Sequence, residues 1–283
     1  MMKIFKNRIV LASALFGLLD FLQGFIIASP ILIYLRLIYE NKESSLSLWP
    51  LPSARVITDF ILNHNDVIIF YLITASVLYT VYFIFKTLFA GGIYSLILFE
   101  KKNDNSIKSS GEFMGYSTIT WTGFLKVGLF AIIVYTIAFF IGSMFGDFVG
   151  RFSGFLKVVI IALFLLMGST YLQILRIHIV ASSDNSLRRA MAGTKEAISK
   201  GFLRLIMGNV SVSIVVFILV MVMWFILRAL KSSEWNVIIM IFTIIVQQLM
   251  VFTICLGQSL RINFNYSVIK KGENNALGGD ELG

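Results

Sequence analysis

The sequence has 283 residues, of which 58% are hydrophobic and 14% charged, and its formal net charge is +9. Soluble domains carry roughly 25% charged residues, so this composition excludes an ordinary soluble protein and indicates a polytopic membrane protein. The single cysteine, Cys255, lies in an apolar run, which excludes a disulfide framework and a cysteine metal cluster. Because Lys and Arg gather beside the ends of apolar runs, the positive charge indicates anionic lipid rather than nucleic acid as the partner.

Six apolar runs are long enough to cross a hydrocarbon core of roughly 30 Å as helices. The first run follows a basic N-terminus but is too long for a signal peptide, so we expect a retained span with a break at Pro30. In the second run we expect Gly91-Gly92 to end the span and residues 93–99 to continue in the membrane interface. The predicted spans are residues 9–39, 67–90, 124–144, 155–175, 202–227 and 237–259.

Two connectors have the pattern of amphipathic helices that lie on the membrane surface. The first is residues 53–61, before the second span, where Ser53 can cap a short helix. The second precedes the fifth span, where apolar residues recur at helical spacing from Leu187 to Ile198 and Glu196 can pair with Lys200 four residues later. Basic residues occupy much of its remaining circumference: Arg188, Arg189, Lys195 and Lys200.

Six spans place both termini on the same side of the membrane. The amino terminus, the connectors after spans two and four and the carboxyl terminus hold most of the Lys and Arg residues, so both termini are predicted to be cytoplasmic. Residues 1–271 then form one membrane domain, and the polar, Gly-rich residues 272–283 are expected to be disordered. The predicted fold is an all-α bundle of six transmembrane helices in the plasma membrane.

One pattern, Gly followed by seven residues and then Gly-Phe-Leu with Lys or Arg, occurs three times. The copies are GYSTITWTGFLK from Gly115, GDFVGRFSGFLK from Gly146 and GTKEAISKGFLR from Gly193. Each opens an apolar run, so we interpret it as an anchor at a helix start, where Phe and Leu enter acyl chains and the cation reaches lipid phosphate. The predicted anchors are Lys126, Lys157 and Arg204.

Charges inside spans cost roughly 2.5 to 3.5 kcal/mol on insertion scales, so Asp20 and Lys86 require an explanation. They can form a buried ion pair, or a proton or cation site with Gln23. Otherwise the Lys86 side chain extends to the lipid headgroups, and Asp20 is either protonated or hydrogen-bonded within the bundle. The different expected depths of the two residues argue against a simple pair. The remaining polar residues of the spans either line a cavity or hold helices together: Gln173, Asn209, Ser211, Gln247 and Gln248.

The sequence contains no recognisable set of catalytic residues. Two isolated histidines without a neighbouring carboxylate or cysteine cluster do not indicate a metal site, and the serines lack identifiable base and acid partners. Neither a phosphate-binding glycine loop nor a zinc-binding helix signature is present. We therefore expect no enzyme activity, no metal and no cofactor.

Five stretches combine small residues, aromatic residues and basic anchors: GGIYSLI from Gly91, EFMGYSTITWTGFLKV from Glu112, QILRIHIV from Gln173, SLRRAMAGTKEAISKGFLRL from Ser186 and GQSLRINFNYSV from Gly257. They resemble a broad group of six-span bacterial integral membrane proteins. That group is distantly similar to the membrane domain fused to some glycerophosphodiester phosphodiesterases, whose chemistry resides in a separate soluble barrel. The resemblance implies a bacterial six-helix membrane module and nothing catalytic.

We therefore expect a non-enzymatic accessory or scaffold protein of the plasma (inner) membrane. Its basic cytoplasmic face would bind anionic lipid headgroups or a protein partner, although positive-inside topology alone also explains the charge. The alternative is a small transporter or lipid-handling permease with a polar intramembrane site around Asp20. A transporter would need a cavity near mid-membrane, whereas a scaffold would have a bundle closed at this residue.

Overall fold

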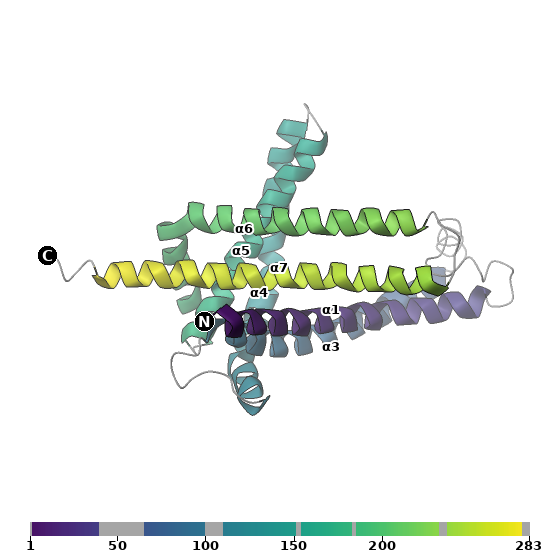
Figure 1. The fold of residues 1–283 in the computed structure, drawn as a ribbon, viewed down its shortest axis with the longest axis horizontal. Helices are drawn as coiled ribbons and strands as arrows, with labels where there is room; N and C mark the ends of the chain where they lie inside the picture. The colour runs from purple at the N-terminus through teal and green to yellow at the C-terminus, as the bar shows by residue number, and fades with distance from the viewer. Residues whose placement is uncertain are drawn as a thin grey trace. The chain divides into compact units, whose positions relative to one another are not determined.

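A computed structural model describes residues 2–39, 65–99, 110–150, 154–182, 185–231 and 237–278 (Figure 1). Within these ranges the chain forms six helices that are each long and apolar enough to cross a membrane. They are α1 (Met2–Tyr39), α3 (Asn65–Leu98), α4 (Ser110–Gly150), α5 (Gly154–Ser182), α6 (Leu187–Lys231) and α7 (Val237–Gly278). The predicted all-α, six-span fold is confirmed for the described residues.

The helices belong to two compact units. The larger unit contains Met1–Gly17 and Thr87–Gly283, and the smaller contains Leu18–Lys86. In the larger unit α6 and α7 run side by side, and the hairpin of α4 and α5 crosses them (Figure 1). The smaller unit holds the remaining parts of α1 and α3.

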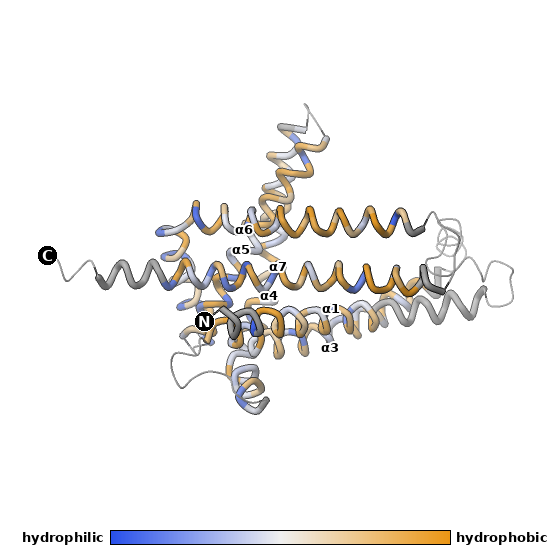
Figure 2. Tube along the Cα trace, viewed as in Figure 1, coloured by the Kyte–Doolittle hydropathy of each residue, from blue (hydrophilic) through white to orange (hydrophobic). Residues whose placement is uncertain are grey.

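The surface of the helices is strongly apolar, as a protein solvated by hydrocarbon requires. Figure 2 shows hydrophobic residues along most of α6 and α7, with hydrophilic residues gathered at the N-terminal end of α6. Side chains such as Ile132, Phe140 and Phe217 are more than half exposed. In lipid only a helix or a closed barrel satisfies all backbone hydrogen bonds, so apolar runs of this length fold as helices.

The second long helix does not break at Gly91-Gly92, where we expected the second span to end. Helix α3 continues through both glycines to Leu98, and the residues after them are buried within the protein, with Ile93 and Tyr94 each only 1% exposed. A Cβ atom at Gly91 would overlap the Thr120 hydroxyl on α4. The two glycines therefore permit close packing of helices, which is their usual role in membranes, and they do not break the helix.

Three other predicted boundaries also differ from the structure. Pro30 does not end α1, which continues to Tyr39, and α4 begins at Ser110, well before residue 124. Helix α7 extends past residue 259 to Gly278, because Ile262, Asn265 and Ile269 recur at helical spacing and are buried against the bundle. Residues 272–278 are thus helical where disorder was expected, and residues 279–283 lie outside the described ranges, as does the predicted surface helix at 53–61.

Helix α6 bends at Gly201, whose backbone angles (φ −139°, ψ 17°) are not helical. The bend separates the segment 187–200 from the apolar segment that begins at residue 202, as predicted for a surface helix followed by the fifth span. Ala190 and Thr194 are buried on one face of the first segment. The basic residues Arg188, Arg189, Lys195 and Lys200 are all exposed, so this segment has the predicted amphipathic character.

Gly208 on α6 lies directly against α7, so a substitution there tests how closely the two helices pack. A Cβ atom at this position would overlap the Phe264 ring on α7, whereas a Cβ atom at Gly115 on α4 would meet nothing within 4 Å. We expect Gly208→Ala to lower the free energy of unfolding by about 1–3 kcal/mol, since overpacking displaces the ring or the helix. Gly115→Ala should be neutral or stabilising, because Ala favours helix by about 1 kcal/mol. Unfolding in detergent micelles measures both, and equal effects of the two variants would contradict this packing account.

Candidate functional site

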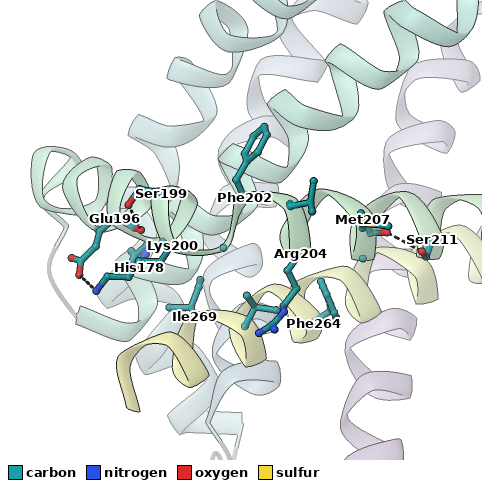
Figure 3. Close-up of a pocket in the computed structure, with 16 residues that line it drawn as sticks. His178, Glu196, Ser199, Lys200, Phe202, Arg204, Met207, Ser211, Phe264 and Ile269 are labelled. Atoms are coloured by element: carbon teal, nitrogen blue, oxygen red, sulfur yellow. Dashed lines mark hydrogen bonds and ion pairs between the residues drawn. The ribbon is translucent and has the colours of Figure 1, made fainter. Parts of the chain in front are cut away.

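A cavity of about 1070 Å³ lies at the bend of α6, between the two segments of that helix and α7 (Figure 3). It exists because Gly201 turns the chain there, so the basic end of the surface segment faces the first turns of the apolar segment. Its volume reaches the upper end of the roughly 300–1000 Å³ typical of small-molecule sites. The lining combines cationic, hydroxyl and apolar side chains: His178, Glu196, Ser199, Lys200, Phe202, Arg204, Met207, Ser211, Phe264 and Ile269.

The two cations of α6 in this cavity differ in their partners. Lys200 donates a hydrogen bond of 2.6 Å to Glu196 Oε1, which confirms the predicted pair four residues apart. Arg204 lies one turn further along, and Figure 3 shows it pointing from α6 toward α7 near Phe264. Among the residues that the structure describes, Arg204 has no acidic partner. The cavity therefore contains one neutralised cation and one that can bind an anion.

Glu196 remains ionised in this arrangement. The hydrogen bond and the charge of Lys200, with a further contribution from His178, hold the pKa of the exposed Glu196 carboxyl below its usual value. The carboxylate neutralises Lys200 at neutral pH, so the net charge of the cavity depends mainly on Arg204.

Apolar side chains surround the mouth of the cavity. Leu203 is 71% exposed and Met207 62% exposed, and Phe202 points away from α7 in Figure 3. Exposed apolar groups beside an unpaired cation are typical of side chains at the boundary between hydrocarbon and headgroups. The site has the chemical composition needed to hold a charged headgroup next to the first carbons of acyl chains.

The three copies of the repeated pattern make different contacts. Lys157 on α5 forms an ion pair of 2.5 Å with Asp147 on α4. Lys126 donates a hydrogen bond of 3.3 Å to the backbone carbonyl of Asn185. Both lysines thus have protein partners, whereas Arg204, the third predicted anchor, lines the cavity at the bend of α6.

The interpretation of the pattern as a helix start holds for two copies. Helix α5 begins at Gly154 and the apolar segment of α6 follows the bend at Gly201, but Gly123 lies in the middle of α4. Phe124 is buried, at 1% exposure, and packs edge-on against Tyr94 at 5.3 Å between ring centroids. In that copy Phe enters the protein core rather than acyl chains, because α4 packs against α3 there.

Asp20 and Lys86 form an ion pair, which is one of the alternatives that the sequence left open, although their expected depths argued against a simple pair. In the smaller unit Lys86 Nζ lies 2.7 Å from Asp20 Oδ1 and 3.2 Å from Gln23 Oε1. The Tyr82 hydroxyl donates a 2.7 Å hydrogen bond to the Leu19 carbonyl beside this cluster. Helix α3 continues to Leu98, beyond the predicted end of the second span at residue 90, so Lys86 lies further from the end of its helix than we expected.

A second polar cluster joins α5, α6 and α7 in the larger unit. Asn209 Nδ2 donates to Asn265 Oδ1 at 2.7 Å, and Asn265 Nδ2 donates to Gln173 Oε1 at 3.0 Å. All three side chains are at most 4% exposed. For Asn209 and Gln173 this agrees with the interpretation that polar residues hold helices together. Sequence reasoning missed Asn265, although its place in a helical series of buried residues with Ile262 and Ile269 indicates it.

The remaining predicted site residues lie on different parts of α6 and α7. Ser211 lines the cavity at the bend, whereas Gln247 and Gln248 are exposed on α7. Arg188, Arg189 and Lys195 form an exposed basic surface on the segment that leads into the cavity.

Comparison of the chain with family models, with curated proteins and with solved structures gives no match in any of the three.

Proposed function

We propose that this integral membrane protein is a non-enzymatic accessory protein that binds an anionic phospholipid headgroup in the cavity at the bend of α6. The observation that supports this proposal is Arg204, a cation without an acidic partner among the described residues, in a cavity rimmed by exposed apolar side chains. A guanidinium group offers several N–H donors in a planar arrangement that matches phosphate oxygens. The apolar rim suits the adjoining acyl chains.

The exposed basic segment supports the same function at longer range. Lys and Arg residues near an anionic leaflet each contribute about 1 kcal/mol of attraction. Arg188, Arg189 and Lys195 lie on the segment that ends at the cavity. With both termini in the cytoplasm, as we propose from the distribution of Lys and Arg, this segment faces the cytoplasmic leaflet of the plasma membrane.

The proposal predicts that Arg204→Gln weakens the binding of phosphatidylglycerol about fivefold, which corresponds to the loss of roughly 1 kcal/mol. The measurement is titration of the purified protein in neutral detergent with phosphatidylglycerol and, separately, with diacylglycerol, which lacks the phosphate. Arg228→Gln is the matched control, because Arg228 lies on the same helix but at its far end, over the Trp224 ring. Equal affinities of the two variants for phosphatidylglycerol would refute the proposal.

A transporter would instead use the cluster of Asp20, Gln23 and Lys86. The side chains of Asp20 and Lys86 retain 34% and 36% exposure, which supports access to the pair. Transport through this site requires the ion pair to open during turnover, whereas an accessory protein requires only that the pair persist. We favour the accessory function, because the charges of the pair already neutralise each other.

A further inference from the structure

The cavity at the bend of α6 contains a titratable side chain, His178, to which the binding of phosphate by Arg204 gives no role. His178 belongs to α5, whereas the charged residues of the lining, Glu196, Lys200 and Arg204, all belong to α6. Figure 3 shows His178 on the same side of the cavity as Glu196 and Lys200. Histidine has an ordinary pKa of about 6.5, so its charge changes close to neutral pH.

Close packing holds His178 in this position. A Cβ atom at Gly193 would lie 2.9 Å from His178 Nδ1 and 3.0 Å from Cε1, so the imidazole ring lies against the backbone of the segment 187–200. Glu196 follows Gly193 by three residues and therefore lies one turn along the same segment. The imidazole is thus part of the wall of the cavity, next to its ion pair.

Protonation of His178 changes the net charge of the cavity. Glu196 and Lys200 neutralise each other through their 2.6 Å ion pair, so Arg204 sets the net charge while His178 is neutral. Helix α7 contributes only apolar residues to the lining: Phe264, Val268 and Ile269. A protonated His178 therefore raises the net charge from one positive charge to two. Glu196 stays ionised meanwhile, since Lys200 and, to a lesser extent, His178 hold the pKa of its carboxyl below the usual value.

We propose that His178 is part of the headgroup site and that its protonated form strengthens the binding of anionic headgroups. This inference rests on the function proposed above for the same cavity. Coupling between two ligands is reciprocal, so a proton on His178 favours the bound anion and the bound anion favours the proton. The gain in affinity is complete well below the pKa of the histidine and is lost as the pH rises through it.

The test is titration of the full chain in neutral detergent with phosphatidylglycerol at about pH 5.5 and about pH 7.5, on either side of the ordinary histidine pKa. The phosphodiester is ionised at both values. We expect the wild type to bind about three- to fivefold more tightly at the lower pH, the effect of roughly one cation near an anionic lipid. His178→Gln should lose this dependence, and His64→Gln, which replaces the other histidine of the chain, should keep it. The same dependence in His178→Gln as in the wild type would overturn the proposal.

A second measurement leaves His178 in place, in case a substitution beside Gly193 prevents folding. In the His64→Gln protein His178 is the only histidine, so nuclear magnetic resonance of its imidazole protons reports the pKa of this side chain. We expect saturating phosphatidylglycerol to raise that pKa by about 0.5, the counterpart of threefold tighter binding, and diacylglycerol to leave it unchanged. An unchanged pKa with phosphatidylglycerol overturns the role of His178, and the headgroup site stands if Arg204→Gln still weakens binding. Equal binding by Arg204→Gln and Arg228→Gln overturns both.

Discussion

Lys86→Leu is expected to lower the free energy of unfolding by about 2 kcal/mol, because it leaves the Asp20 carboxylate without its cation in a membrane helix. Insertion scales assign roughly 2.5 to 3.5 kcal/mol to such a charge, and the 34% exposure of Asp20 reduces that cost. Asp20→Leu should cost less, about 1 kcal/mol, since the long lysine side chain can extend toward the headgroups whereas an aspartate cannot. The asymmetry between the two single variants is specific to a membrane.

The double variant Asp20→Leu/Lys86→Leu should be close to the wild type in stability, because both charges are removed together. The measurement is equilibrium unfolding in mixed detergent micelles, with the four proteins arranged as a double-mutant cycle. Lys157→Leu is the comparison for an exposed pair, and we expect a loss of less than about 0.5 kcal/mol from it. Additive losses in the double variant would show that Asp20 and Lys86 do not stabilise each other.

The ion pair of Asp20 and Lys86 shows which feature the sequence alone does not determine. The sequence identified both residues as charges that require a partner, but depth along a helix depends on where the helix ends. Gly91-Gly92 has the composition of a helix break in water, and in lipid the same residues permit close approach of helices. Only the packing of Thr120 on α4 against Gly91 distinguishes the two roles.

The basic residues of the repeated pattern also show what the sequence alone does not determine at the candidate site. The repeated spacing correctly placed the start of the apolar segments at Gly154 and Gly201. It did not predict which cation would be unpaired, because the partners of Lys157 and Lys126 are supplied by α4 and by the connector at Asn185. The cavity beside Arg204 likewise depends on how α7 lies against the bend, which hydrophobic periodicity does not determine.

Asn265→Leu is expected to cost about 2 kcal/mol of unfolding free energy, although leucine has a similar volume and a better match to a membrane helix. Asn265 is the central member of the cluster, since it accepts from Asn209 and donates to Gln173. Its removal leaves the buried Gln173 oxygen without a donor, whereas Asn209 Nδ2 keeps its bond to the Leu205 carbonyl. An unsatisfied buried group costs about 1–3 kcal/mol, and an interhelical hydrogen bond in lipid contributes about 0.6 kcal/mol.

The control for this prediction is Asn263→Leu, a half-buried position on the same helix outside the cluster, which should change stability by less than about 0.5 kcal/mol. Gln173→Leu in the Asn265→Leu background should recover part of the loss, because it removes the oxygen that was left unpaired. A coupling energy near zero between these two positions would mean that packing alone holds α5 against α7. A positive coupling would show that the cluster fixes the position of these helices, since apolar contacts in lipid leave their relative position only weakly determined.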